Sequence, residues 1–163
     1  MPSNSFIDYL KHVENGAKIG WDESQQLWFP HKSPEGGNDT IAYGHKLLDA
    51  EVEQANKGLT DGEVEEMLVE DLDLAEHGAK NILYDHFNKD FDSLSEDKQE
   101  MLIDFSFNLG CYGLKRFPKF VGAICSDDKA TMCQEYKRYF TDGFGVKKEL
   151  KQRNEEFYTL FLA

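Results

Sequence analysis

The sequence lacks long apolar runs, paired cysteine motifs and an excess of basic residues. A membrane-spanning helix needs about 20 consecutive apolar residues, and every apolar stretch of this sequence is much shorter. The three cysteines, Cys111, Cys125 and Cys133, are odd in number and have no CxxC spacing, so we expect free thiols, or at most one disulfide with a spare thiol. The N-terminal segment has no basic region followed by an apolar stretch, and we therefore expect no signal peptide.

Basic residues are few, with 18 Lys plus Arg against 31 Asp plus Glu, and the formal net charge is -13. The imbalance lies mainly in residues 51–100, which hold 4 basic and 16 acidic residues, whereas residues 101–163 hold 10 and 8. A strongly acidic chain is a poor candidate for gripping nucleic acid or an anionic membrane, so we expect neither partner. Hydrophobic residues make up 40% of the chain, enough to build a core.

Apolar periodicity and turn residues predict an α+β fold. Residues 5–15 have helical spacing, whereas residues 17–48 combine glycine and proline with short branched or aromatic runs, which is typical of a small antiparallel unit of strands 27–31 and 39–43. The later segments are helical: residues 59–82, 95–109, 117–125, 129–140 and 147–162. We expect a single domain over residues 1–163, with a β lobe in residues 1–58, a helical lobe in residues 59–163 and a cleft between them.

Local signals fix two of these helix starts. Thr60 and Glu63 have the spacing of a capping box, with Leu59 and Val64 placed as a hydrophobic staple. Ser95 is expected to cap the next helix, whose apolar residues from position 101 to 109 lie on nearly every side and predict a buried helix.

Several residues near the N-terminus could carry acid–base chemistry. Glu14 ends the first helix, where the negative end of the helix dipole favours the protonated form of a carboxyl group, as a general acid requires. Glu35 and Asp39 flank a glycine-rich turn, and Thr40 could hold a water beside a carboxylate. Two carboxyl groups are what glycoside hydrolysis commonly uses. A residue of each of these types, taken alone, is more often an ordinary solvated helix-end, turn or strand residue.

Other chemistries have weaker support. His31, Glu35, Asp39 and His45 cluster in sequence, but HExxH and finger spacings are absent, so we expect no metal and no cofactor. There is also no GxSxG and no GxxxxGK[ST], which argues against a serine hydrolase and a phosphate-binding loop.

Taken together, Glu14-Asn15-Gly16 and the stretch Asp39-Thr40-Ile41-Ala42-Tyr43-Gly44-His45 resemble the phage-type lysozymes, glycoside hydrolase family 24. The long helix after Leu59, the buried segment 101–110 and the closing segment 150–161 extend the resemblance over nearly the whole chain. It implies a lysozyme-like fold with a small β-hairpin lobe and a mainly helical lobe.

The resemblance also implies site roles. Glu14 matches the general acid, Thr40 matches the hydroxyl that positions water, and His45 matches a structural histidine. Further candidates are the following: Tyr43, Lys46, Phe107 and Asn108 for substrate binding, and Arg153 beside the acid. The family usually has an Asp six residues before the Thr, but Pro34 stands there, so Glu35 is our first choice for the second carboxylate and Asp39 the alternative.

The expected activity is that of a muramidase, which hydrolyses the β-1,4 bond between N-acetylmuramic acid and N-acetylglucosamine in bacterial peptidoglycan. Two alternatives stay open: a lytic transglycosylase with a single catalytic Glu, and a non-catalytic peptidoglycan-binding virion protein. We expect a monomer that acts on the glycan strand. We also expect it to stay in the host cytoplasm until a membrane pore releases it to the cell wall, or to be carried in the virion.

Overall fold

The structure is a computed structural model that describes residues 2–32 and 39–163. It divides into two compact units, which are treated separately below. The hairpin unit comprises Ile7–Asp71, and the helical unit comprises Met1–Phe6 and Leu72–Ala163. Helices combined with short antiparallel hairpins make an α+β protein, as the sequence predicted. In the described part, no helix is both long enough and apolar enough to cross a membrane.

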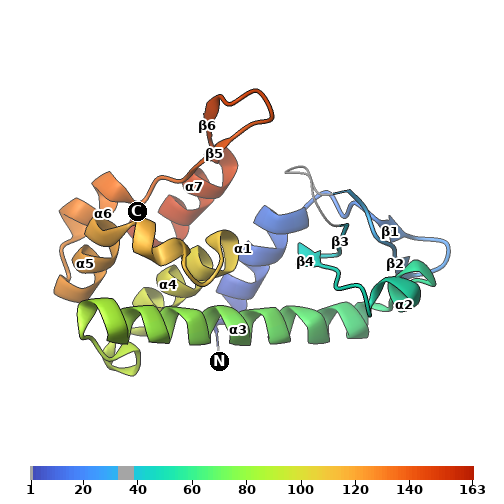
Figure 1. Ribbon diagram of the computed structural model, residues 1–163, viewed down its shortest axis with the longest axis horizontal. Helices are drawn as coiled ribbons and strands as arrows, with labels where there is room; N and C mark the ends of the chain where they lie inside the picture. Colours follow the sequence, from blue (N-terminus) through green and yellow to red (C-terminus); the bar gives the residue numbers. More distant parts are fainter. Residues whose placement is uncertain (1, 33–38) are drawn as a thin grey trace. The chain divides into compact units, whose positions relative to one another are not determined.

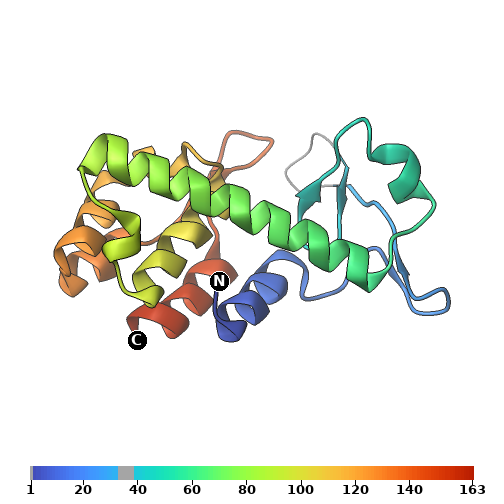
Figure 2. The ribbon, with the colours of Figure 1, turned by 90° about the horizontal axis from the view of Figure 1, so that it is seen from below.

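The hairpin unit begins within α1 and ends within α3, the long green helix of Figures 1 and 2. Its elements are α1 Asn4–Asn15, β1 Trp21–Asp22, β2 Leu27–Trp28, β3 Thr40–Ile41, β4 His45–Lys46, α2 Val52–Asn56 and the first turns of α3 Asp61–Phe87. The short helix α2 has no counterpart in the sequence prediction.

The strands of this unit form two hairpins instead of one pair of longer strands. β1 pairs with β2, with Trp21 opposite Trp28, and β3 pairs with β4, with Thr40 opposite Lys46. The two hairpins are joined by a single antiparallel bridge between His31 and Thr40. The prediction that residues 27–31 and 39–43 pair directly is therefore correct only at this bridge. Elsewhere β2 pairs with β1 and β3 pairs with β4, which are closer in sequence.

A compact core holds the hairpin unit together. Its buried members are Trp28, Ile41, Ala42, Leu47, Ala55, Leu59 and Val64. Trp28 is 1% exposed, exchanges backbone hydrogen bonds with Leu59, and donates its indole N–H to Asp61 Oδ1 at 2.7 Å. Since a buried indole needs a partner for its N–H, this contact ties the strands to the start of α3.

The predicted capping box at the start of α3 is confirmed. The Glu63 carboxylate accepts hydrogen bonds from the Thr60 amide and hydroxyl at 2.8 Å each, and the Glu63 amide donates to Thr60 Oγ1 at 3.3 Å. Four apolar residues at helical spacing on this helix are also buried: Val64, Leu68, Leu72 and Ala75. Capping and burial together explain why a helix of 27 residues forms here.

The helical unit contains the rest of α3 and the C-terminal elements. These are η1 Phe91–Ser93, α4 Glu96–Leu109, η2 Gly113–Arg116, α5 Pro118–Ser126, α6 Lys129–Glu135, β5 Tyr139–Thr141, β6 Lys147–Glu149, α7 Lys151–Phe157 and the π-helical η3 Tyr158–Leu162. Helices α5 and α6 lie side by side in both ribbon views (Figures 1 and 2).

Helix α4 is the centre of this unit, as its apolar sequence predicted. Residues 100–106 are all buried. The ring of Phe105 stacks on Phe120 at 4.5 Å and meets Phe117 and Phe157 edge-on at 5.1 and 5.6 Å. Ser95 occupies the N-cap position, but its side chain makes no capping hydrogen bond, so that part of the prediction is wrong.

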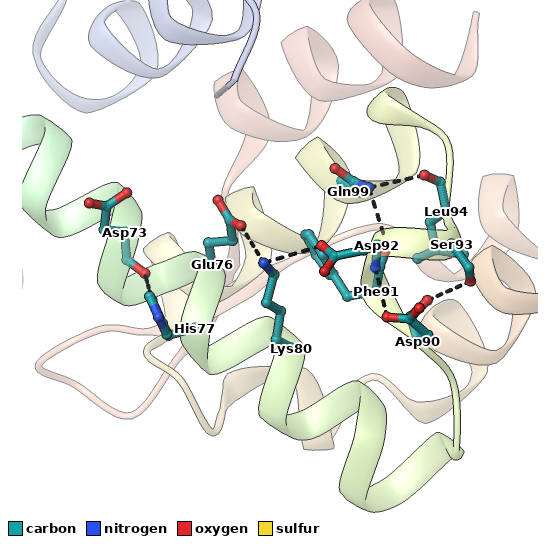
Figure 3. A network of polar contacts seen from close by, with 10 residues as sticks. All are labelled: Asp73, Glu76, His77, Lys80, Asp90, Phe91, Asp92, Ser93, Leu94 and Gln99. Carbon is teal, nitrogen blue, oxygen red and sulfur yellow. Dashed lines mark hydrogen bonds and ion pairs between the residues drawn. The ribbon is translucent and has the colours of Figure 1, made fainter.

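A polar network fastens the connection between α3 and α4 (Figure 3). Lys80 of α3 forms ion pairs with Glu76 at 2.8 Å and with Asp92 of η1 at 3.2 Å. The side-chain amide of Gln99 in α4 donates to the carbonyls of Phe91 and Leu94 at 3.3 and 3.0 Å. Gln99 thereby supplies a donor to the Leu94 carbonyl and a second donor to the Phe91 carbonyl, which also accepts from the Leu94 amide.

The predicted helices over 129–140 and 147–162 are wrong at their facing ends, where β5 and β6 form a hairpin instead. The reason lies in the turn. The carboxylate of Asp142 accepts hydrogen bonds from the amides of Phe144 and Val146 at 2.9 Å each, and Gly145 adopts a φ of 76°. An Asp that bonds its own backbone and a glycine in the left-handed region favour a turn over a continuing helix.

Candidate active site

The end of α1 is fixed by Asn15, a residue that the sequence analysis did not single out. Its buried side chain donates to the carbonyls of Ile19 and Ala42 at 2.9 and 2.8 Å and accepts from the Ile19 amide at 2.9 Å. Asn15 therefore links the C-terminal end of α1 to the turn between β3 and β4. That link determines where the neighbouring Glu14 is held.

The carboxylate of Glu14 lies against Gly44 in this turn. A Cβ atom placed on Gly44 would stand 2.8 Å from Glu14 Oε2, and Gly44 has a φ of 87°. Only glycine combines that backbone conformation with so close an approach. The structure thus brings the predicted general acid against the hairpin that carries Thr40.

Thr40 is buried, with 6% of its surface exposed, and its hydroxyl contacts His31. The distance from Thr40 Oγ1 to His31 Nε2 is 3.2 Å, and the two residues exchange backbone hydrogen bonds of 2.8 and 2.9 Å. His31 was considered in the sequence only as a metal ligand. Its position opposite Thr40 depends on the bridge between the two hairpins, which no local motif signals.

The two candidates for the second carboxylate differ in what the structure says of them. Asp39 is half-exposed, and its Oδ1 lies 3.0 Å from Nζ of the exposed Lys32. Part of its charge is thus balanced by a lysine. Glu35, the first choice from the sequence, lies outside the described residues.

Of the predicted substrate-binding residues on the hairpin, Tyr43 packs into the core of the unit and Lys46 is exposed. The Tyr43 ring lies 5.4 Å from the Trp28 ring, and Lys11 Nζ lies 5.4 Å from the Tyr43 ring centre. Burial is the main reason that the pKa of the Tyr43 hydroxyl is raised. These contacts make Tyr43 a packing residue, with its ring edge only partly available to a ligand.

His45 lies between two carboxylates. Its Nδ1 is 2.9 Å from Asp71 Oδ2 and its Nε2 is 3.0 Å from Glu51 Oε2. The hydrogen bond to Asp71, together with Glu51, raises the pKa of His45 to about 9 against the cost of burial. These contacts connect β4 to the 48–51 turn and to α3.

In the helical unit, Arg153 forms part of a buried charged cluster. Its Nη2 lies 2.6 Å from Asp104 Oδ1, and Nη2 of Arg138 lies 2.7 Å from Asp104 Oδ2. Arg138 is fully buried over the ring of Phe105 at 4.2 Å. The two guanidinium groups lower the pKa of Asp104 against the effect of burial. Asp104 and Arg138 were not predicted as a pair, although an Asp within an apolar helix indicates a buried partner.

The other two predicted substrate-binding residues also lie in the helical unit, on α4. Asn108 accepts a hydrogen bond from Arg138 Nη1 at 3.3 Å, so its amide is oriented by the charged cluster. Phe107 is half-buried. The three cysteines are free thiols, as predicted.

Known proteins are similar to this chain at three levels. The family model described as phage lysozyme matches residues 29–156, a segment that includes Thr40 and Arg153 but begins after Glu14. Peptidoglycan hydrolase gp36 of Enterobacteria phage SP6 is 30% identical over 150 residues, which cover 85% of this chain and 14% of that protein. The chain therefore corresponds to about a seventh of that relative's length.

Among solved structures, the muramidase domain of SpmX from Asticaccaulis excentricus superposes with a TM-score of 0.55 at 16% identity. The match covers 100% of this chain and 98% of that domain. It confirms the lysozyme-like α+β fold predicted from the sequence. The family model covers well over half of the sequence, and the chain belongs to the phage lysozyme family.

Proposed function

We propose that this domain is a muramidase that hydrolyses the β-1,4 bond from N-acetylmuramic acid to N-acetylglucosamine in bacterial peptidoglycan. The observation that carries the proposal is the placement of the Glu14 carboxylate against Gly44, on the same hairpin as the buried hydroxyl of Thr40. A proton donor and a water-holding group are the two functions that cleavage of a glycosidic bond by water requires.

In this mechanism Glu14 protonates the leaving glycosidic oxygen as the bond to the sugar C1 breaks. A water held by Thr40 attacks C1. Asp39 or Glu35 assists by stabilising the positive charge that develops on the sugar ring or by orienting the water. The substrate is the glycan strand, the domain acts as a monomer, and no cofactor takes part.

The delivery route belongs to the same proposal. We infer that the domain reaches the wall either from the host cytoplasm through a pore made by another protein or as part of the virion. Membership of a phage family and similarity to a segment of a much longer phage protein support either route.

Digestion of purified cell walls by the purified chain tests the proposal. We expect soluble fragments with new reducing ends, and we expect Glu14→Gln to lower the rate by at least about 100-fold, as is typical when a general acid is lost. Glu70→Gln, which neutralises an exposed acid on α3, is the matched control and should retain activity.

Mass spectrometry of the fragments separates the alternatives. Fragments that end in 1,6-anhydro sugars would identify a lytic transglycosylase, which needs only one carboxyl group and no water. Binding to walls without any release of fragments would identify a non-catalytic module. Either result would refute the proposed hydrolysis.

A further inference from the structure

The hydrogen bond between Thr40 and His31 lies at the bridge between the two hairpins, and the roles proposed above leave it unused. His31 Nε2 lies 3.2 Å from Thr40 Oγ1, and the two residues form the bridge that joins the hairpins. We propose that His31 is the positioning residue for Thr40 and receives, through that hydroxyl, the proton released by the attacking water. This inference rests on the proposed hydrolase function.

Strand alternation separates the two faces of the β3–β4 hairpin. Ile41 and His45 are register partners, and together with Val64 and Leu68 of α3 they line a cavity of about 10 Å³, so their face packs on α3. Successive side chains of a strand point to opposite faces. Thr40, one residue earlier, therefore belongs to the other face, the one that does not pack on α3.

Residues directly opposite in an antiparallel pair share a face. Thr40 is opposite His31 on one side and opposite Lys46 on the other. The three side chains thus form a row, with the hydroxyl in the middle, the imidazole on one flank and the exposed lysine on the other. A ligand that approaches this face meets the hydroxyl together with its flanking histidine.

Hydrogen-bond capacity determines which way the Thr40 hydroxyl points. A threonine hydroxyl has one hydrogen to donate and two lone pairs that accept, whereas a neutral imidazole has one acceptor nitrogen. When Nε2 of His31 accepts the Thr40 hydrogen, both Thr40 lone pairs are available for the hydrogens of a water. The imidazole thereby fixes the orientation in which Thr40 can hold the nucleophile.

The surroundings of His31 favour the neutral imidazole that this arrangement needs. Burial lowers the pKa of His31, and the nearby charge of Asp39 only partly opposes this effect. Asp39 is itself paired with Lys32 at 3.0 Å, and Lys46 adds a positive charge on the far side of Thr40.

The proton balance of the step is complete without any other reactant. The water oxygen bonds to C1 while the bond from C1 to the glycosidic oxygen breaks and that oxygen takes the proton of Glu14. A proton of the water moves to Thr40 Oγ1 as the hydrogen of Thr40 moves to His31 Nε2. The cycle ends with Glu14 ionised and His31 protonated, and exchange with solvent restores both.

His31→Gln is the informative variant, because the glutamine carbonyl can still accept the Thr40 hydrogen but cannot be protonated near neutral pH. We expect kcat/KM on purified walls to fall by about 100-fold or more, the range for loss of a general base. We also expect the limb of the pH–rate profile in which wild-type activity falls with acid to disappear. His77→Gln, on the exposed surface of α3, should change neither quantity.

A second readout does not depend on activity. Nitrogen NMR of the histidine side chains should show His31 with its hydrogen on Nδ1 and with Nε2 as acceptor, and Thr40→Val should shift the Nε2 resonance. Unchanged thermal unfolding of His31→Gln would exclude misfolding as the cause of a lost rate. If His31→Gln had the same rate and the same pH profile as the wild type, the proposal would be overturned.

Failure of this inference and failure of the proposed function give different results. If wild-type protein releases no reducing ends, the hydrolase function itself is wrong. If wild-type protein is active, Glu14→Gln is inactive and His31→Gln is as active as wild type, only the role of His31 is wrong. The role of His31 would also be wrong if Asp39→Asn or Glu35→Gln, and not His31→Gln, abolished the fall in activity at acid pH.

Discussion

The Glu14 carboxylate lies close to Gly44, in the turn between β3 and β4. A Cβ atom on Gly44 would be 2.8 Å from Glu14 Oε2, well inside the distance at which carbon and oxygen repel. The geometry of the proposed site thus depends on the absence of a side chain at one turn position.

Gly44→Ala should impair both activity and stability. The methyl group would displace the Glu14 carboxylate, and alanine disfavours the φ of 87° by about 1 kcal/mol or more. We expect at least a tenfold loss of activity on purified walls and a lower thermal midpoint. Gly143→Ala is the control, since nothing lies within 4 Å of its added Cβ. Full activity of Gly44→Ala would show that the position of Glu14 does not depend on this contact.

Asn15→Ala should loosen the end of α1. The substitution removes three hydrogen bonds of the side chain and takes this donor away from the buried Ala42 carbonyl, which costs about 1–3 kcal/mol in the free energy of unfolding. Since Glu14 is the preceding residue, the activity should fall further than the stability loss explains. Urea unfolding and wall digestion measure the two effects, with the exposed Asn56→Ala as control. Equal activity of Asn15→Ala and wild type would show that the side chain of Asn15 does not hold Glu14 in position.

His45 should make the folded protein less stable as the pH rises above neutral. Its pKa is raised to about 9 in the folded protein, chiefly by the hydrogen bond to Asp71, whereas the pKa of a histidine in the unfolded chain is about 6.5. Folding is therefore favoured fully below about 6.5, and this contribution is lost as the pH rises through about 9. Urea midpoints between pH 6 and 10 should fall for wild type and stay nearly level over this range in His45→Gln. His77→Gln should behave like wild type, and a level wild-type curve would contradict the assignment.

Asp104→Asn should be the most destabilising of these changes. The neutral amide would leave Arg138, which is fully buried, and Arg153 without their shared counterion, and breaking a buried charge pair costs about 3–5 kcal/mol. The thermal and urea midpoints should both drop strongly. Asp97→Asn, on the exposed first turn of the same helix, should have little effect. A near-normal midpoint in Asp104→Asn would mean that the arginines find other partners.

Local sequence was sufficient for features that depend on neighbours along the chain. The helix over 4–15, the capping box at Thr60 and the buried helix α4 follow from periodicity and short-range hydrogen bonds. The β5–β6 hairpin was missed because helical segments precede and follow it, and the decisive contacts come from Asp142 and Gly145 in the turn. The helix propensities of single residues do not predict whether such a segment continues two helices or forms a turn.

The candidate site divides in the same way. Glu14 and Thr40 were identified from residue type and from the resemblance to a family. His31, Asn15 and the Asp104–Arg138 pair were not, because each acts through a partner distant in sequence, as far as 34 residues for Asp104 and Arg138. A single sequence records no distances between such positions.

The sequence by itself determined the fold class and the acidic character of the chain, and it led to the proposal that Glu14 is the acid. Residue types, periodicity and charge are properties of the chain that packing does not change. The tertiary structure alone decided that Thr40 faces His31, that Glu14 lies against Gly44 and that His45 is held by two acids. These relationships arise when bridges and turns bring separate segments within about 3 Å, the range over which hydrogen bonds form.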